Sequence, residues 1–393
     1  MRNLIGLLTI GILIAACGPT QQSKNLTGDK LYEAAGQNIL VVDSKTQSIE
    51  RRLPLGAPSN DWKHLYSMVG DSMVDTDPVT GNTQNSLRVG AGYQLPPATH
   101  TGLPGGLSPH GAWLVLQAGD ASSTHMAIVD TQAFKVTDRV DLAGRFIFDA
   151  ISDDGLRLYL IQYLNGKEYY VRLFDVRTNS LDANIVVDKS DGNQAMAGLR
   201  LSGIATPDGG SLFSMYVRAD QSPFIHALSL SGPFAFCIDL PGAGYATGKA
   251  SSMQWALAMN QFGTRVYAIN GASGIVAEVD SSSMQVLRTA QIKSDPSGAT
   301  GASAAVLSPD GKTLVTASNA GIVWVDTSNL QVRMEALAEW HVWSLGLTPD
   351  GQTLFVVNDA GQVAEVSMSS GAVLARFDPG AGKPLALMRV ALS

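Results

Sequence analysis

The stretch from Ser308 to Val332 reads SPDGKTLVTASNAGIVWVDTSNLQV, and it contains the pattern that recurs along most of this chain. It opens on a tight turn, in which Pro pre-sets φ, Asp tolerates the bend and Gly takes the positive φ. A short strand, a second turn and a strand ending in Val-Asp-Thr follow. Similar turns end at Gly111, Gly155, Gly209, Gly263 and Gly351. With Gly311, these glycines are 44, 54, 54, 48 and 40 residues apart, so the unit repeats at that interval.

The signal at the strand end indicates how many units there are. An apolar residue followed by Asp, or by Ser in two degenerate copies, closes eight hairpins. These pairs begin at Val42, Val74, Val129, Phe174, Leu228, Val279, Val325 and Val366. In the last unit we expect strands at Val342–Leu347, Thr353–Asn358, Gln362–Ser367 and Ala372–Phe377. Four antiparallel strands per 40 to 54 residues are typical of a β-propeller blade, and no stretch favours a helix.

The two ends of the array complete each other. The first hairpin, Leu31 to Asp43, lacks a first strand, whereas Leu385 to Leu392 resembles a first strand without its turn. We expect these segments to pair in one blade, because pairing would close the ring and remove both open edges. Eight hairpins predict eight blades. Seven is the alternative, since the repeat around Asp61 to Tyr66 leaves almost no room for its own first strand.

The segments SPDGKTLVTA and GIVWVDTSNLQV resemble YVTN-type and WD-like β-propeller repeats, and the resemblance covers roughly residues 30–392. It implies an all-β ring of four-stranded antiparallel blades, which we expect over residues 31–393. Seven blades are the commoner number in proteins of this kind. The resemblance implies little about function, because propellers serve both as binding modules and as several unrelated enzymes.

The first 30 residues predict an export signal and a lipid anchor. After Arg2, an apolar stretch of 13 residues runs from Leu4 to Ala16. As a helix it would span about 20 Å, which is short of the roughly 30 Å hydrocarbon core of a membrane. Ile14 to Cys17 reads IAAC and resembles the lipobox of bacterial lipoproteins. The resemblance implies a signal peptide at 1–16, lipidation of Cys17 and a flexible tether over 17–30, on the outer side of a bacterial membrane.

Charge and cysteine content narrow the range of partners. The formal net charge is −7 and no run of Lys or Arg interrupts the acidic balance, which argues against nucleic acid as a partner. The chain has two cysteines, so lipidation of Cys17 would leave Cys237 without an intramolecular disulfide partner. Cys237 lies in an expected strand, where we interpret it as a small buried hydrophobe. We expect a monomer that binds the membrane through its lipid and a protein or another envelope component through its propeller.

The candidate binding site lies on one face of the ring. Turns between the second and third strands are long in three consecutive blades, at 118–125, 162–168 and 218–224, whereas turns on the opposite face are short and uniform. Variable loops on a rigid scaffold are where binding surfaces are built. The expected inner strands and their entry loops add charged and aromatic candidates at the channel mouth, namely Arg145, Asp149, Arg200, Trp255, His341 and Trp343.

The sequence offers no catalytic or metal-binding motif. The six histidines have no metal-ligand spacing, and no nucleophile elbow occurs. Ala243 to Ala250 nearly matches a phosphate-binding loop, but Ala250 replaces the hydroxyl residue and a strand is expected next, so we set it aside. We therefore expect no cofactor, no metal and no catalytic residue, and a non-enzymatic binding or scaffold lipoprotein. The alternatives are a propeller enzyme, such as a lactonase or quinoprotein dehydrogenase, and a structural envelope protein.

Overall fold

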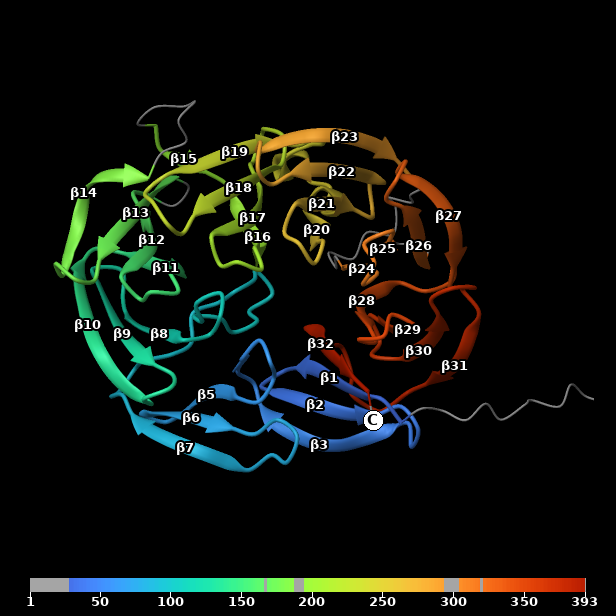
Figure 1. The fold of residues 1–393 in the computed structure, drawn as a ribbon, viewed down its shortest axis with the longest axis horizontal. Coiled ribbons are helices and arrows are strands. Elements are labelled where there is room, and N and C mark those ends of the chain that lie inside the picture. Colours follow the sequence, from blue (N-terminus) through green and yellow to red (C-terminus); the bar gives the residue numbers. More distant parts are fainter. Residues whose placement is uncertain (1–27, 166–167, 187–193, 293–303, 319–320, 393) are drawn as a thin grey trace, which may run out of the picture.

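The computed structural model describes residues 28–165, 168–186, 194–292, 304–318 and 321–392. Over these residues the chain forms eight antiparallel sheets arranged in a ring, which Figure 1 shows face-on. The sheets follow one another in chain order, and we number them as blades 1 to 8. The all-β fold and the count of eight blades confirm the prediction from the repeats, and the alternative of seven was wrong.

The first four blades differ more from one another than the last four do. Blade 1 contains β1 (Lys30–Ala35), β2 (Asn38–Asp43), β3 (Ser48–Pro54) and β32 (Ala386–Ala391). Blade 2 contains β4 (Ala57–Pro58), β5 (Leu65–Val69), β6 (Ser72–Thr76) and β7 (Thr83–Arg88). Blade 3 contains β8 (Trp113–Gly119), β9 (Ser123–Asp130) and β10 (Lys135–Ala143). Blade 4 contains β11 (Phe146–Ile151), β12 (Arg157–Tyr163), β13 (Glu168–Asp175), β14 (Ser180–Val186) and β15 (Met196–Ala197).

The last four blades each have four strands. Blade 5 contains β16 (Leu199–Ala205), β17 (Ser211–Val217), β18 (Phe224–Ser229) and β19 (Ala235–Asp239). Blade 6 contains β20 (Trp255–Met259), β21 (Arg265–Asn270), β22 (Ile275–Asp280) and β23 (Gln285–Gln291). Blade 7 contains β24 (Ala305–Leu307), β25 (Thr313–Ser318), β26 (Gly321–Asp326) and β27 (Gln331–Ala336). Blade 8 contains β28 (Val342–Leu347), β29 (Thr353–Asn358), β30 (Val363–Ser367) and β31 (Val373–Phe377).

Two features of the chain depart from a purely β prediction. Two short 3-10 helices, η1 (Tyr245–Thr247) and η2 (Ala250–Met253), lie between blades 5 and 6, where we expected no helix. The short β4 confirms that the repeat around Asp61 has little room for a first strand, and blade 2 nevertheless forms. Among the described residues, no helix is long and apolar enough to cross a membrane.

The ring closes by pairing the two ends of the domain. Strand β32 lies antiparallel to β1, with Lys30 opposite Ala391 and Ala34 opposite Ala386. The C-terminal segment thus supplies the inner strand that the first hairpin lacks, as predicted. Because the last strand of the chain completes the first blade, neither of these strands leaves an open edge in the ring.

The core is divided among the eight contacts between neighbouring blades. Each contact buries its own cluster of apolar side chains, and together the eight clusters cover the whole ring. Alternation along each strand causes this, since successive side chains point to opposite faces of a sheet. In β25, for example, Leu314 packs toward blade 6 and Val315 toward blade 8. Each blade is therefore stabilised mainly by its two neighbours.

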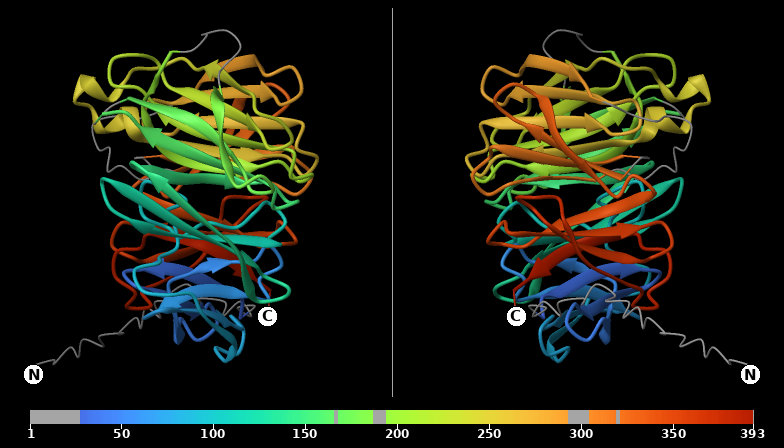
Figure 2. Two further views of the ribbon diagram at one scale, coloured as in Figure 1. Left: turned by 90° about the vertical axis from the view of Figure 1, so that its left-hand side faces the viewer. Right: turned by 90° about the vertical axis from the view of Figure 1, so that its right-hand side faces the viewer.

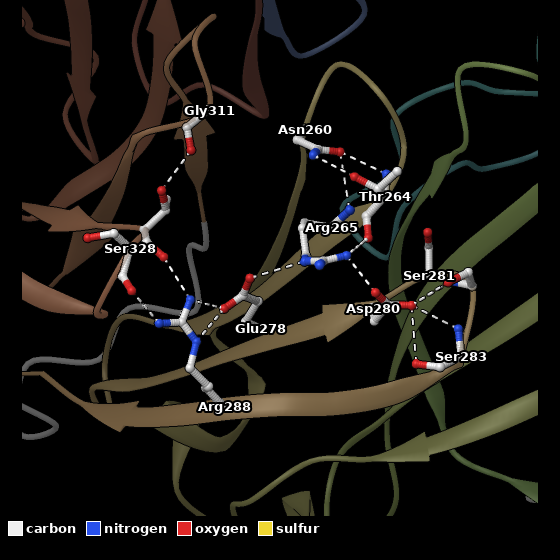
Figure 3. A network of polar contacts seen from close by, with 12 residues as sticks. Asn260, Thr264, Arg265, Glu278, Asp280, Ser281, Ser283, Arg288, Gly311 and Ser328 are labelled. Carbon is white, nitrogen blue, oxygen red and sulfur yellow. Dashed lines mark hydrogen bonds and ion pairs between the residues drawn. The ribbon is translucent and has the colours of Figure 1, made fainter.

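The recurring turn sequences make the same hydrogen bonds in several blades. The hydroxyl of Thr327, which follows the strand-end Asp, donates to the carbonyl of Gly311 at 2.8 Å. Ser281 contacts Gly263 in the same way at 2.6 Å, and Figure 3 shows both regions. The strand-end Asp280 accepts backbone N–H groups from its own turn. The Asp and Thr of the Val-Asp-Thr pattern thus provide hydrogen-bond partners for backbone groups that would otherwise lack them.

Charged side chains near these turns also join neighbouring blades. Glu278 of blade 6 is buried between Arg265 and Arg288, as Figure 3 shows. The guanidinium of Arg288 donates further to the carbonyls of Thr327 and Ser328 in blade 7, at 2.8 and 2.5 Å. The turns that join strands one to two and three to four are therefore occupied with contacts inside the ring.

Blade 3 obtains its inner edge from a loop. The segment 89–112 folds back along β8, with isolated bridges between Gln94 and Gln117 and between Leu107 and Leu114. Gly106 has a φ of +103°, and a Cβ atom there would lie 2.5 Å from the carbonyl oxygen of Val115, so only glycine allows this approach. The segment therefore both connects blade 2 to blade 3 and takes the place of an inner strand.

Candidate functional site

The two faces of the ring are built differently. We call the face with the strand one-to-two and three-to-four turns the tight-turn face, and the opposite one the long-turn face. The turns that follow Gly119, Tyr163 and Val217 belong to the long-turn face, because each comes after the second strand of its blade. Figure 2 shows the ring edge-on, with η1 and η2 projecting from one face and the C-terminal end on the other.

A cavity of about 770 Å³ lies on the long-turn face between blades 4 and 5. We call it the inter-blade cavity. Two of the three long turns predicted from the sequence contribute to its wall. Its polar lining includes Asn165, Glu168, Arg218, Asp220 and Gln221, and its aromatic lining Tyr170, Phe224 and Tyr245. A concave site with apolar rings and a few polar groups is the usual form of a ligand site.

Arg218 organises one wall of the inter-blade cavity. Its guanidinium lies 3.8 Å from the centre of the Phe224 ring and 2.8 Å from the carboxylate of Asp239. The backbone carbonyl of Arg218 accepts a hydrogen bond from the N–H of Tyr245, which fastens the turn to the η1 segment. On the opposite wall, the amide of Asn165 donates to Glu168 at 2.7 Å. Both long turns thus present charged groups that are held by defined contacts.

Cys237 lies in the wall of the inter-blade cavity and is half-buried. The sequence predicted a buried residue, and the prediction was wrong because alternation along β19 turns this position toward the cavity. The thiol sulfur is 3.9 Å from Nδ1 of His226, the residue opposite it on β18. The cavity wall therefore contains a thiol beside an imidazole.

A second cavity of about 420 Å³ lies where the third long turn meets blade 4. Asp120 and Thr124 line it together with Arg145, whose guanidinium lies 4.8 Å from the centre of the Tyr163 ring. The side-chain and backbone hydrogen bonds from Ser122 lower the pKa of Asp120 below its ordinary value, so the carboxylate stays charged. Among the site residues predicted from the sequence, Arg145 thus lines a cavity together with a long turn.

A third cavity of about 330 Å³ is lined by blades 2, 4 and 5 and by the loop of blade 3. Asp149 and Arg200 line it as an ion pair with an N–O distance of 2.9 Å, and the Asp149 side chain is only 1% exposed. Gly203 makes room for the guanidinium, since a Cβ atom there would lie 2.8 Å from Nη2. Among the described residues, the second carboxylate oxygen of Asp149 and Nε of Arg200 have no partner.

The remaining predicted site residues lie apart from these. Trp255 packs in the core between blades 5 and 6, and it lines a fourth cavity of about 350 Å³. His341 is exposed on blade 8, with Nδ1 3.7 Å from a carboxylate oxygen of Asp359. Trp343 lies under the ammonium of Lys383 at 4.1 Å. The structure therefore brings Asp149 and Arg200 together, but it does not gather all six residues at one channel mouth.

The sequence missed several residues that line these cavities. Tyr170 was not predicted, because nothing in the local pattern shows that its segment borders a cavity. Tyr245 and Lys249 were set aside with the near-match to a phosphate-binding loop at 243–250. Cys17 lies outside the described residues. Among the residues that the structure describes, no group of three or more His, Cys, Asp or Glu side chains could hold a metal ion.

Comparisons with known proteins support the fold and go no further. No protein-family model matches the chain, and no curated protein matches it in sequence. Among solved structures, it is similar to dihydro-heme d1 dehydrogenase NirN in complex with DHE, with a TM-score of 0.57 and 13% identity over 93% of this chain and 76% of that chain. Kuenenia stuttgartiensis hydrazine synthase is 14% identical over 80% of this chain and 99% of that chain, with a TM-score of 0.44. At these identities the first similarity shows the propeller fold, and the second carries no argument.

Proposed function

We propose that this protein is a membrane-anchored, exported lipoprotein whose propeller is a non-enzymatic binding module, and that it captures its partner on the long-turn face. The inter-blade cavity carries the proposal. It combines about 770 Å³ of space with charged and aromatic side chains from two neighbouring blades. Such a mixture suits the recognition of a protein or another envelope component better than bare turn backbone does.

The tight-turn face offers much less to a partner. Its strand-end Asp side chains accept N–H groups of their own turns, as at Asp280, and Arg288 joins blade 6 to blade 7. On the long-turn face, Asp220, Gln221 and Tyr245 are exposed beside the inter-blade cavity. Exposed side chains with adaptable hydrogen bonding are available there, so this face is the stronger candidate for recognition.

The position of the domain's first strand indicates which face of the ring would point toward the membrane. Lys30 begins β1 opposite Asp43 and Ala391, which are the last residues of β2 and β32. All three lie at the tight-turn face, because the turn after β2 is one of the three-to-four turns. A lipid on Cys17 with a tether over 17–30 would therefore attach from the tight-turn side and leave the long-turn face toward the partner.

Site-specific photo-crosslinking in intact cells tests the binding face. A photoreactive amino acid is placed at Asp220, at Gln221 or at Tyr245, and the matched control carries it at Lys312 or Gln352 in exposed turns of the tight-turn face. We expect one recurrent crosslinked component from the three cavity positions and none from the two control positions. Crosslinks from the control positions alone would show that the wrong face was chosen.

A separate experiment tests the anchor. We expect Cys17→Ser to move the protein from the detergent phase to the aqueous phase, because the acyl chains supply its membrane affinity at about 0.8 kcal/mol per methylene. The matched control is Cys237→Ser, which leaves the lipobox intact. The lipoprotein proposal fails if the Cys17 variant still partitions with the membrane and wild-type protein contains no lipid by mass spectrometry.

A further inference from the structure

We propose that the fourth cavity, between blades 5 and 6, binds a small phosphate monoester. This site is distinct from the inter-blade cavity and does not depend on the function proposed above. The cavity has a volume of about 350 Å³, which is at the lower end of the range for small-molecule sites. Its wall combines the loop 240–254 with the turn that follows β21.

The chemistry of the cavity wall points to an anionic ligand. Six of the lining side chains are polar, and all six are hydroxyl, amide or ammonium groups: Thr247, Lys249, Ser251, Ser252, Asn270 and Ser273. Among the described residues that line the cavity there is no carboxylate, although the whole chain has 34 Asp and Glu against 27 Lys and Arg. The Ser252 hydroxyl already donates to the carbonyl of Lys249 at 2.8 Å, so the donors left for an anion are the ammonium of Lys249 and the hydroxyls of Thr247, Ser251 and Ser273.

Lys249 supplies a positive charge that the described part of the protein does not neutralise. Its ammonium has no carboxylate within ion-pair distance among the described residues, whereas Lys30 and Lys63 are each paired. A compact ammonium on a flexible stem is a common ligand for phosphate oxygens. The lysine is exposed at the mouth of the cavity, so it can reach a bound phosphate without being buried itself.

The floor of the cavity is held in place by Asn270. Its side-chain amide donates to the carbonyl of Ser251 at 2.8 Å, and its oxygen accepts the N–H groups of Ala272 and Ser273 at 3.1 and 2.9 Å. These contacts join the two walls. The hydroxyl of Ser273 has no hydrogen-bond partner among the described residues, so its O–H remains available to a ligand.

The apolar side of the cavity indicates the rest of the ligand. Trp255 and Ile275 line it, and the Trp255 indole is nearly fully buried, so only part of it reaches the cavity. A Cβ atom at Gly242 would lie 3.3 Å from Cζ2 of this indole, and the glycine thus keeps the mouth open. A ring-sized apolar group attached to a phosphate fits both sides of the wall.

The sequence of the loop agrees with this assignment in part. Residues 243–250 nearly match a phosphate-binding loop, and the sequence alone argued against them because Ala250 replaces the hydroxyl residue. In the structure, Ser251 and Ser252 follow directly in η2 and line the cavity. A phosphate also has three terminal oxygens, which can use more donors than the two oxygens of a carboxylate.

Ligand-observed NMR and calorimetry with the full-length protein test the proposal. The probes are phenyl phosphate, benzoate, benzyl alcohol and methyl glucoside. We expect phenyl phosphate to bind most tightly and inorganic phosphate to compete with it. Lys249→Ala should weaken phenyl phosphate binding about tenfold or more, since a hydrogen bond to a charged group is lost. Lys249→Arg should retain most of the affinity, and Lys312→Ala, an exposed lysine of the tight-turn face, should change nothing.

Three outcomes would overturn the proposal. Equal binding of benzyl alcohol and phenyl phosphate would show an apolar site without phosphate recognition. Binding of methyl glucoside in place of phenyl phosphate would assign the cavity to a neutral sugar. Capture of vesicles containing phosphatidic acid, reduced by Lys249→Ala but without binding of phenyl phosphate, would assign it to a lipid headgroup. Loss of partner crosslinking at Asp220 would not affect any of these measurements, so the two proposals fail separately.

Discussion

Glu33→Gln should stabilise the folded protein at neutral pH. Glu33 is fully buried on β1, opposite Leu40 and Leu387, which belong to the apolar cluster between blades 8 and 1. Neither carboxylate oxygen has a hydrogen-bond partner among the described residues. Burial away from water therefore raises the pKa of this carboxyl to about 8, from an ordinary value of 4.5.

The direction and size of the effect follow from the two pKa values. The unfolded chain releases the Glu33 proton above about pH 4.5, whereas the folded chain keeps it until about pH 8. Stability should thus fall as the pH rises through this window and level off above it. From about pH 4.5 to pH 7, ionisation of Glu33 in the unfolded chain lowers the free energy of unfolding by about 1.36 kcal/mol per pH unit. Over these roughly 2.5 units the loss amounts to about 3 kcal/mol. Gln is neutral in both states, so the substitution removes this cost.

Chemical unfolding at several pH values measures the effect. We expect Glu33→Gln to raise the free energy of unfolding by about 3 kcal/mol at pH 7 and to leave it nearly unchanged at pH 4. Glu50→Gln is the matched control. Glu50 lies on β3 of the same blade, is 41% exposed and pairs with Lys30 at 2.7 Å, so its loss should cost no more than about 1 kcal/mol. Equal stability of wild type and Glu33→Gln at pH 7 would refute the reasoning, because the carboxyl would then have a partner.

One deletion and two substitutions further test the architecture. Deleting residues 385–393 removes β32, so blade 1 loses its inner strand and the thermal midpoint of the whole domain should fall. An unchanged midpoint would mean that the ends do not pair. Asp149→Asn should lower the free energy of unfolding by about 2 kcal/mol, since it leaves the Arg200 guanidinium without its charged partner, whereas Asp220→Asn at an exposed turn should not. Gly106→Ala should destabilise more than Gly92→Ala in urea unfolding, because both positions have a positive φ but only Gly106 meets a carbonyl oxygen at 2.5 Å. Equal costs would show that the loop of blade 3 relaxes around the added methyl group.

The regular part of the fold could be predicted because it is encoded locally. In blade 8 the expected strands Val342–Leu347 and Thr353–Asn358 coincide with β28 and β29, and the other two begin one residue later than expected. Turn residues with fixed backbone requirements set these limits. The ring closure was also predictable, since an incomplete hairpin at one end and an unpaired strand at the other leave a single way to complete both.

The irregular parts depend on contacts that no local pattern contains. The loop 89–112 is rich in Gly and Pro, so nothing in it indicates a strand, yet the N–H of His100 donates to the carbonyl of Leu201, about a hundred positions away. Asp149 and Arg200 were each recognised as channel candidates, but their pairing depends on the small Gly203. Glu33 was missed altogether, because an acidic residue at a strand centre is usually solvated.

The distribution of the cavities follows from the same division between local and long-range order. Three of the four, the first, second and fourth, are lined by long turns and blade-to-blade connections, which vary most in length. The third also takes Asn60 and Ser108 from turns of the tight-turn face. The tight-turn face cannot vary in this way, because side chains such as Thr327 and Asp280 are needed there to satisfy backbone groups. Changes in the long turns alter exposed side chains without removing these bonds or the apolar clusters between blades. The architecture thus lets the binding surface diverge while the ring, which rests on neighbour contacts and one closing strand pair, keeps its stability.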